Sequence, residues 1–360
     1  MKRLSRLIAA ITLLLAAESI ASPAEALKIQ NSWKLSMENW SVNARTAVTP
    51  EARAKVIAER PDAATYARQM WQTIGLSLKE DWTLKPAAWF LQITRSQITR
   101  NADGSTVPTF AIETEAVRKS VETDHLKSPN LIPMCMALAA ESDPRSLSIL
   151  EKIETGNPDK KIQGVAALGA AMILKNLGDN PDLVRKRLTY LRKAIINSSD
   201  VDLNGITVAT LAENELYLIR YLAKGRVAPD ISGLDAAGRP IKLSDMKGKV
   251  VLLLFWSSTI QESDRVIQMT ASMVKKFNDR PLVVLGVNHD SLEILRSMEA
   301  EGTVNWRNFS DPENKLADEY RITSWPTVYV LDGERKIHYI GTQGTFAELT
   351  AEALLSETQP

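Results

Sequence analysis

The sequence is poor in the residues that bind soft metals and form disulfides. Its 360 residues contain one cysteine, Cys135, and three histidines, His125, His289 and His338. A single thiol cannot form an internal disulfide, and histidines this far apart in sequence make no spaced ligand motif. We therefore expect no metal site and no cofactor. Cys135 lies in the apolar stretch 131–138, which favours a buried, structural role for its thiol.

An excess of charge of either sign is also absent. The chain has 44 Lys and Arg against 43 Asp and Glu, a formal net charge of +1 at pH 7, and no basic cluster interleaved with aromatic residues. Nucleic-acid binding needs a basic surface that neutralises phosphates. The composition therefore predicts that nucleic acid is not a partner.

Long apolar runs are lacking except for a short one near the N-terminus. The run 7–17 follows three basic residues and precedes the small residues of 24–26. This is the pattern of a secretory signal peptide, and the run is far shorter than the roughly 20 residues of a membrane-spanning helix. We expect residues 1–26 to be cleaved after Ala26, with Ala21 as the second candidate site. The mature chain is then periplasmic or secreted without a stable membrane anchor, and a retained N-terminal anchor is the alternative.

From residue 27 to about 224, apolar residues recur at helical spacing. This predicts an N-terminal all-α domain of residues 27–224. Turn-forming residues at 143–144, 156–158 and 178–181 divide it into short helices joined as hairpins. The stretch 162–196 has the length and glycine placement of one tetratricopeptide (TPR) unit. A TPR-like helical repeat and an ordinary helical domain both remain open.

After Gly225, short aliphatic runs replace the helical spacing, which marks a domain boundary. The continuous apolar runs Val250–Phe255 and Leu282–Val287 are typical of strands buried on both faces. A helix is expected between them, over residues 261–277. Strand, helix and strand then form a βαβ unit, whose crossover should be right-handed.

Further along the chain, two more runs predict an antiparallel hairpin. Val328–Leu331 and Lys336–Ile340 flank the turn that begins at Asp332. A final helix is expected over about 345–355. Residues 225–360 are thus predicted to form an α/β domain with a mixed central sheet.

Four segments of this domain follow one another in the order known from one family. They are Leu243–Trp256 and residues 286–290, 304–307 and 324–332. The first resembles the LSDxxGKVVLLxFW opening of redoxin and TlpA-like domains of the AhpC/TSA superfamily, and the others resemble that family's later landmarks. The resemblance covers about residues 225–345. It implies a thioredoxin-like fold and the activity of a thiol-disulfide oxidoreductase.

The resemblance also places the family's redox motif, and both of its cysteines are missing. In redox members a Trp-Cys-Gly-Pro-Cys turn opens the helix after the Phe-Trp strand. The helix N-terminus there stabilises a thiolate, and the second cysteine resolves the mixed disulfide. Aligned without a gap, the cysteine positions are Ile260 and Ser263. Isoleucine has no nucleophile, no histidine is near in sequence to activate the serine, and peroxide chemistry needs the same absent sulfur. We predict no catalytic residue.

Two features around this turn indicate what replaces the motif. Thr259 and Glu262 have the spacing of a capping box, which would stabilise the helix end as structure. The resemblance implies that Pro326 is a cis-proline beside the turn, where redox members offer backbone hydrogen bonds to an extended peptide. We expect an exposed, shallow apolar patch there. Its candidate binding residues are Trp256, Thr259, Ile260, Gln261, Glu262, Ser263, Trp325 and Pro326.

Three hypotheses on function remain open. The chain is a redox-inactive binding module for a protein or peptide partner in the cell envelope. Alternatively, it is a thiol-disulfide oxidoreductase or antioxidant, as the resemblance alone implies. In the third hypothesis, the helical domain is a structural or assembly scaffold and the C-terminal domain is a passive passenger. The pair His289–Asp290 is expected to mark a strand-to-helix loop.

Overall fold

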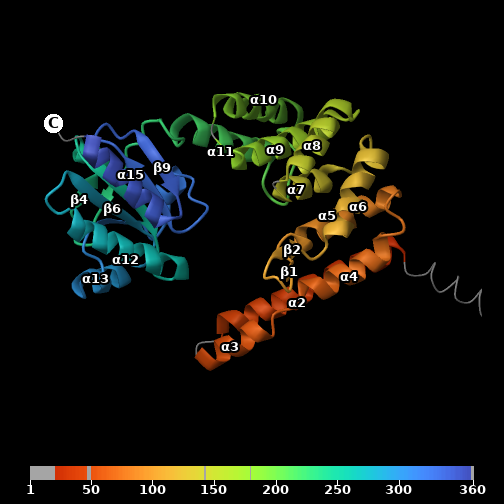
Figure 1. The fold of residues 1–360 in the computed structure, drawn as a ribbon, viewed down its shortest axis with the longest axis horizontal. Coiled ribbons are helices and arrows are strands. Elements are labelled where there is room, and N and C mark those ends of the chain that lie inside the picture. The colour runs from red at the N-terminus through yellow and green to blue at the C-terminus, as the bar shows by residue number, and fades with distance from the viewer. Residues whose placement is uncertain (1–20, 47–49, 142, 179, 358–360) are drawn as a thin grey trace, which may run out of the picture. The chain divides into compact units, whose positions relative to one another are not determined.

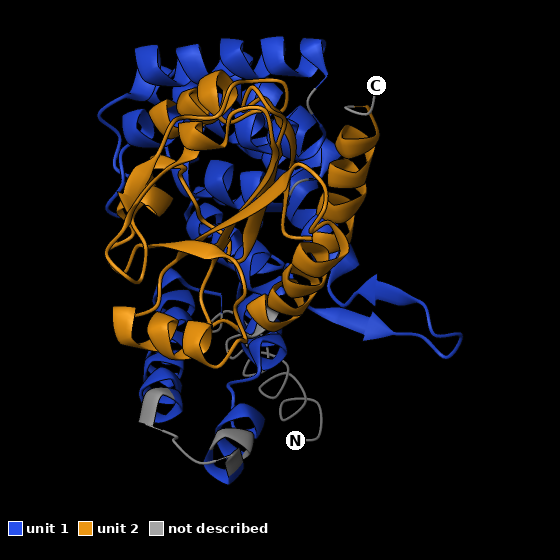
Figure 2. Ribbon diagram, turned by 90° about the vertical axis from the view of Figure 1, so that its left-hand side faces the viewer, with its two compact units in different colours: residues 1–212 blue, residues 213–360 orange. Residues whose placement is uncertain are grey.

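The computed structural model describes residues 21–46, 50–141, 143–178 and 180–357. The chain divides into two compact units, residues 1–212 and 213–360 (Figures 1 and 2). Their border falls within helix α11, a short way before the change of sequence pattern near Gly225. The first 20 residues of the expected signal peptide lie outside the described residues.

The first unit is helical with one β-hairpin. Its elements are α2 (Pro23–Thr46), α3 (Pro50–Ala58), α4 (Ala63–Ile74), the 3-10 turn η1 (Asp81–Thr83), α5 (Leu84–Thr94), β1 (Ile98–Arg100), β2 (Thr106–Pro108), α6 (Ala111–Ser120), the π-helical turn η2 (Val121–His125), α7 (Ile132–Glu141), α8 (Pro144–Gly156), α9 (Lys160–Asn176), α10 (Pro181–Ser198) and the start of α11 (Val208–Tyr221). In the described part of the chain, no helix combines the length and apolar character needed to cross a membrane.

The predicted turns coincide with helix ends, and their side chains explain why. Asp143, Asp159 and Asn180 are the N-caps of α8, α9 and α10, and each side chain accepts a hydrogen bond from a backbone N–H of its helix. The prediction of helical hairpins is confirmed at α9 and α10, which approach closely. A Cβ added at Gly164 of α9 would lie 1.8 Å from Ser198 Oγ of α10. A repeat array remains a prediction.

The β1/β2 hairpin was not predicted, because the sequence marked only its loop. Ile98 pairs with Pro108 and Arg100 with Thr106 in an antiparallel ladder. All residues of the two strands are exposed. Strands this short, with no buried face, leave no alternation of apolar and polar residues in the sequence.

The second unit has a five-stranded mixed sheet with helices on both faces. Its elements are the end of α11, β3 (Ser232–Leu234), β4 (Pro240–Lys242), the 3-10 turn η3 (Leu243–Met246), β5 (Val250–Trp256), α12 (Gln261–Lys276), β6 (Leu282–Asn288), α13 (Leu292–Ala300), β7 (Arg307–Ser310), α14 (Lys315–Glu319), β8 (Thr327–Leu331), β9 (Ile337–Gly341) and α15 (Gly344–Glu357). The strand order is β7-β6-β5-β8-β9. β5, β6 and β7 run parallel, and β8 and β9 pair antiparallel.

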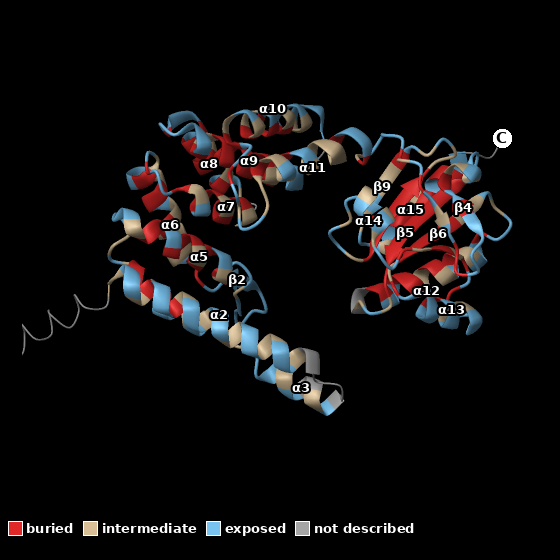
Figure 3. Ribbon diagram, turned by 180° about the vertical axis from the view of Figure 1, so that it is seen from behind, coloured by how far each residue is buried: buried red, intermediate tan, exposed pale blue. Residues whose placement is uncertain are grey.

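Central strand β5 is buried along its whole length, as its apolar run predicted (Figure 3). Because side chains alternate between the faces of a sheet, its residues divide between two cores. Leu252, Leu254 and Trp256 pack with α12 and α15. Val251, Leu253 and Phe255 form a second core with residues of α14 and the segment after α11. The predicted βαβ unit, hairpin and final helix are all present.

Candidate functional site

The end of β5 is fixed by a buried hydrogen bond of Trp256. Its indole N–H donates to Asn308 Oδ1 of β7 at 3.0 Å, and its ring packs edge-on against Trp306. Gly286 of β6 leaves the space for this bond, since a Cβ there would lie 1.8 Å from Asn308 Oδ1. Trp256 is wholly buried. The expectation that it forms part of an exposed patch is therefore wrong, and its role is to position the turn after β5.

That turn is held by Asp290, which follows β6. The carboxylate accepts hydrogen bonds from the Ser257 hydroxyl at 2.6 Å, the Ser258 N–H at 2.9 Å and the Asn288 amide at 2.9 Å. Asp290 is only 5% exposed. Burial by itself raises a carboxyl pKa, but the hydrogen bonds from Ser257, Asn288 and Ser258 outweigh it and lower the pKa of Asp290.

Asp290 was expected to mark a loop and was not among the predicted site residues. The signal that could have found it is its position directly after the buried strand β6. β5 and β6 are parallel, with Trp256 opposite Asn288. Their carboxyl ends therefore meet at one edge of the sheet, and a polar residue there faces the turn after β5.

Helix α12 does not begin with the predicted capping box. Its N-cap is Ile260, one residue after Thr259, and the Ile260 side chain makes no capping hydrogen bond. The Thr259 hydroxyl lies 2.8 Å from the Ser257 hydroxyl instead, within the group bound by Asp290. Thr259 thus belongs to the preceding turn. Gln261 and Glu262 open α12, but their side chains lie outside the described residues.

The two positions of the family's cysteines differ in exposure. Ile260 is half-buried. Ser263 is wholly buried, and its hydroxyl has no hydrogen-bond partner among the described residues. Isoleucine has no nucleophilic atom, and no base among the described side chains is hydrogen-bonded to the Ser263 hydroxyl to activate it.

Trp325 and Pro326 lie beside this turn, as the resemblance implied. The peptide bond between them is cis. Pro326 is buried, so the expectation that Pro326 and Ser263 belong to an exposed patch is wrong, as it is for Trp256. The antiparallel register places Thr327 opposite Phe255, so Pro326 is next to the end of β5. Trp325 is half-buried and stacks against the His289 ring, with 5.6 Å between ring centroids. The backbone N–H and C=O of Trp325 form no hydrogen bond with any described residue.

Cys135, the one cysteine of the sequence, belongs to α7 in the first unit. Its side chain is wholly buried, and burial raises the pKa of the thiol to about 12. A thiol with this pKa is almost entirely protonated at neutral pH and is a poor nucleophile.

A mixed sheet of this order, with a cis-proline beside the turn after the central strand, defines the second unit as a thioredoxin-fold domain. Residues 224–340 match the AhpC/TSA family. The thioredoxin-like protein YneN of Bacillus subtilis is 30% identical over 127 residues, which are 34% of this chain and 74% of YneN. The chain belongs to this redoxin family.

Other relatives carry redox names. The thiol-disulfide oxidoreductase ResA of Bacillus subtilis is 28% identical over 129 residues, covering 35% of this chain and 71% of ResA. Among solved structures, the thioredoxin domain of a thiol-disulfide oxidoreductase from Bacteroides vulgatus is 27% identical with a TM-score of 0.34, covering 37% of this chain and 98% of that domain. The family match leaves residues before 224 unassigned.

Replacing Asp290 by asparagine should lower the free energy of unfolding by about 1–3 kcal/mol near neutral pH, because Ser257 and Ser258 lose a carboxylate acceptor. The folded-state pKa of Asp290 is lowered, so its stabilisation is present above the unfolded pKa and is lost as the pH falls through the folded pKa. The stability difference should therefore shrink between about pH 5 and pH 2. Urea unfolding measures it, with the exposed Asp279→Asn as control. A difference that stays constant over this range contradicts the assignment.

Proposed function

We propose that the second unit is a redox-silent thioredoxin-fold module that binds an extended polypeptide segment. The observation that carries this proposal is the replacement of both family cysteines, by Ile260 and Ser263. Disulfide exchange starts with attack by a thiolate and needs a second thiol to release the product. The turn supplies neither, and the thiol of Cys135 is buried in the other unit.

The same turn supports a binding role. Ile260 and Trp325 are half-buried apolar side chains on the two segments beside Pro326, and we call this surface the redoxin groove, after the peptide-binding position of the family. Trp325 also offers a backbone donor and acceptor that pair with no described residue. An extended peptide can use both, with main-chain hydrogen bonds for affinity and apolar contacts for specificity. The Asp290 hydrogen bonds stabilise the turn in one conformation, which lowers the entropic cost of binding.

The alternative is a thiol-disulfide oxidoreductase, and the names of relatives such as ResA favour it. It requires a sulfur that the groove does not contain. The second alternative, a structural or assembly scaffold built by the helical unit, makes no use of the groove. Disulfide-exchange activity separates the first alternative from our proposal, and the effect of groove substitutions on binding separates the second.

We further propose that the chain works in the periplasm or outside the cell on an envelope protein, with the signal peptide removed after Ala21. Cleavage at this site leaves α2 whole. The Ser22 hydroxyl accepts a hydrogen bond from the Glu25 N–H at 3.2 Å in its first turn. Ala26, the site that the sequence pattern ranked first, lies inside the helix and is 3% exposed. Cleavage after Ala26 would remove the first turn and a buried residue.

The first prediction concerns chemistry. The unchanged mature chain should not catalyse insulin-disulfide reduction, and Cys135→Ser should behave identically. The double variant Ile260→Cys, Ser263→Cys should exceed both by at least about tenfold, because it restores a thiolate at the helix N-terminus and a resolving thiol. Turnover by the Cys135→Ser chain itself would refute the redox-silent assignment.

The second prediction concerns the groove. Trp325→Ala should weaken binding of reduced, carboxymethylated α-lactalbumin, a thiol-free unfolded polypeptide, by at least about fivefold, because an aromatic anchor is lost. Phe346→Ala on α15 is the matched control, since it removes an aromatic side chain that is 55% exposed in the same unit. Fluorescence anisotropy gives both affinities. Equal effects of the two substitutions, or none, would favour the scaffold hypothesis.

The third prediction concerns processing. Expressed with its full N-terminus in a bacterium, the exported chain should begin at Ser22, because Ser19-Ile20-Ala21 has the small residues of a cleavage site and cleavage there keeps α2 whole. Intact-mass measurement with N-terminal sequencing reads the end directly. A mature chain that begins at Leu27 would show that the first turn of α2 is dispensable, and a chain that keeps residues 1–21 would show a retained anchor.

A further inference from the structure

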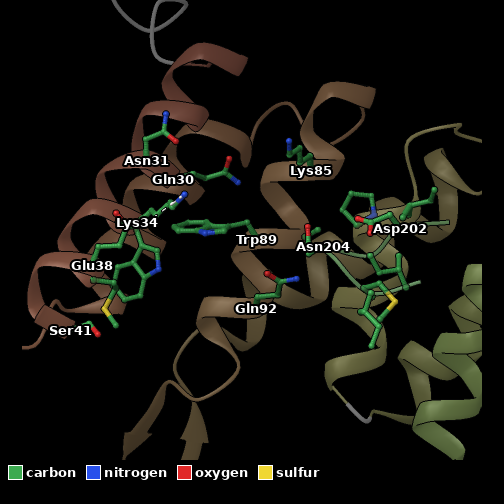
Figure 4. Close-up of a pocket in the computed structure, with 18 of the residues that line it drawn as sticks. Gln30, Asn31, Lys34, Glu38, Ser41, Lys85, Trp89, Gln92, Asp202 and Asn204 are labelled. Atoms are coloured by element: carbon green, nitrogen blue, oxygen red, sulfur yellow. Dashed lines mark ion pairs between the residues drawn. The ribbon is translucent and has the colours of Figure 1, made fainter. Parts of the chain in front are cut away.

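The first unit contains an open cleft of about 1370 Å³, formed entirely by residues between 30 and 211. Helix α2 lines one side, and α7, α9 and the loop 202–206 line the other. Trp89 of α5 projects between the two sides, toward α2 (Figure 4). The cleft lies outside the residues that match the redoxin family.

The two sides of the cleft differ in chemistry. The side formed by α7, α9 and the loop is mainly aliphatic; its lining includes Ile132, Met136, Met172, Leu203 and Ile206, with Asp202 and Asn204 as the polar residues of the loop. The side formed by α2 mixes polar and apolar residues. Its polar residues are Gln30, Asn31, Lys34, Glu38 and Ser41, of which Gln30 and Lys34 extend toward Trp89 in Figure 4. Its apolar residues are Trp33, Met37, Trp40 and Val42. An occupant that fits both sides needs one apolar face and one polar face.

The dimensions of the cleft favour a polypeptide over a small molecule. Its volume of about 1370 Å³ exceeds the range of about 300–1000 Å³ that is usual for small-molecule sites. The lining of α2 extends from Gln30 to Val42, which corresponds to about 18 Å of helix. A helix of about three turns has this length.

The charges that line the cleft are balanced. Lys34 and Glu38 form an exposed ion pair at 3.8 Å, and Lys85 and Asp202 add one charge of each sign. A strongly charged occupant would therefore meet as much repulsion as attraction. A helix whose polar face carries both acidic and basic residues complements this lining.

We propose that this cleft binds an amphipathic helix of a partner protein, with the helix's apolar face on the aliphatic side and on Trp89. Tryptophan commonly anchors interfaces, and methionine adapts to apolar partners of varied shape. Met37, Met136 and Met172 are half-buried here, so they keep surface free for contact. The proposal goes beyond the function proposed for the second unit and does not depend on it.

The test uses the full mature chain and a fluorescein-labelled 16-residue peptide of Leu, Gln, Glu and Lys. Its leucines follow the helical spacing i, i+3, i+4, i+7, its Glu and Lys are equal in number, and a scrambled peptide has the same composition. Anisotropy should show binding of the helical peptide at least about tenfold tighter than that of the scrambled one. The double variant Met37→Gln, Met136→Gln should weaken it by at least about tenfold.

The matched control is Ile196→Gln, which changes an 80% exposed apolar residue of α10 outside the cleft and should leave the affinity unchanged. If the methionine variants unfold, Lys85→Glu tests the proposal, because Lys85 is at an exposed position. This variant should bind a peptide whose polar face carries only Lys more tightly than one whose polar face carries only Glu. Equal binding of both peptides, or insensitivity of binding to the cleft variants, would overturn the proposal. So would binding of an oligosaccharide such as cellohexaose in place of the helical peptide, because the cleft would then be a carbohydrate site. Such a failure does not bear on the Trp325 groove, which none of these variants changes.

Discussion

The hydrogen bond between the Trp256 indole and Asn308 is the interaction on which the rest of the candidate site depends. It crosses β6 at the one position where a glycine leaves room, Gly286. The bond holds the indole ring in one position, and with it the backbone at the end of β5. There the Trp256 carbonyl oxygen accepts a hydrogen bond from the His289 N–H at 3.1 Å. His289 in turn stacks on Trp325. Through His289, this bond connects the end of β5 to the segment of the cis-proline, in addition to the direct pairing of Phe255 with Thr327.

The turn after Trp256 holds a network of hydrogen bonds at the place where redoxins carry their first cysteine. In a redoxin the N–H groups of this turn and the helix N-terminus favour an anion at the first cysteine position. Here the Asp290 carboxylate accepts hydrogen bonds from the Ser258 N–H and the Ser257 hydroxyl. A fixed negative charge therefore already lies beside the turn whose N–H groups would favour that anion. At the second cysteine position, the buried Ser263 hydroxyl gains no partner among the described residues. The fold is retained while the groups that would generate a thiolate are engaged elsewhere or missing.

Much of the second unit could be predicted from sequence, because its strongest signals are local. The runs that became β5 and β6 are continuous and apolar, and the helix between them was placed within one residue at its end.

Features that depend on contacts between distant residues could not be predicted. The role of Thr259 depends on Ser257 and Asp290, and the burial of Trp256 depends on Asn308 and Gly286. Strand β7 is short and carries the polar Asn308 inward, so no apolar run marks it. The cleft of the first unit draws on residues as far apart as Gln30 and Ile206, which no local pattern connects.

Without the two cysteines, the proposed binding of a partner must rely on other contacts. A redox member holds its substrate through a transient mixed disulfide, whereas the proposed groove would hold a segment through noncovalent contacts alone, and these would set the lifetime of the complex. The groove offers two half-buried apolar side chains, Ile260 and Trp325, and the backbone N–H and C=O of Trp325, which pair with no described residue. A standard stable interface involves about 20–30 residues on each side. The aliphatic side of the cleft has more apolar side chains, among them Ile132, Met136 and Met172. The two proposed sites therefore differ in kind: the cleft offers many apolar contacts to a helix, and the groove offers few contacts to an extended segment.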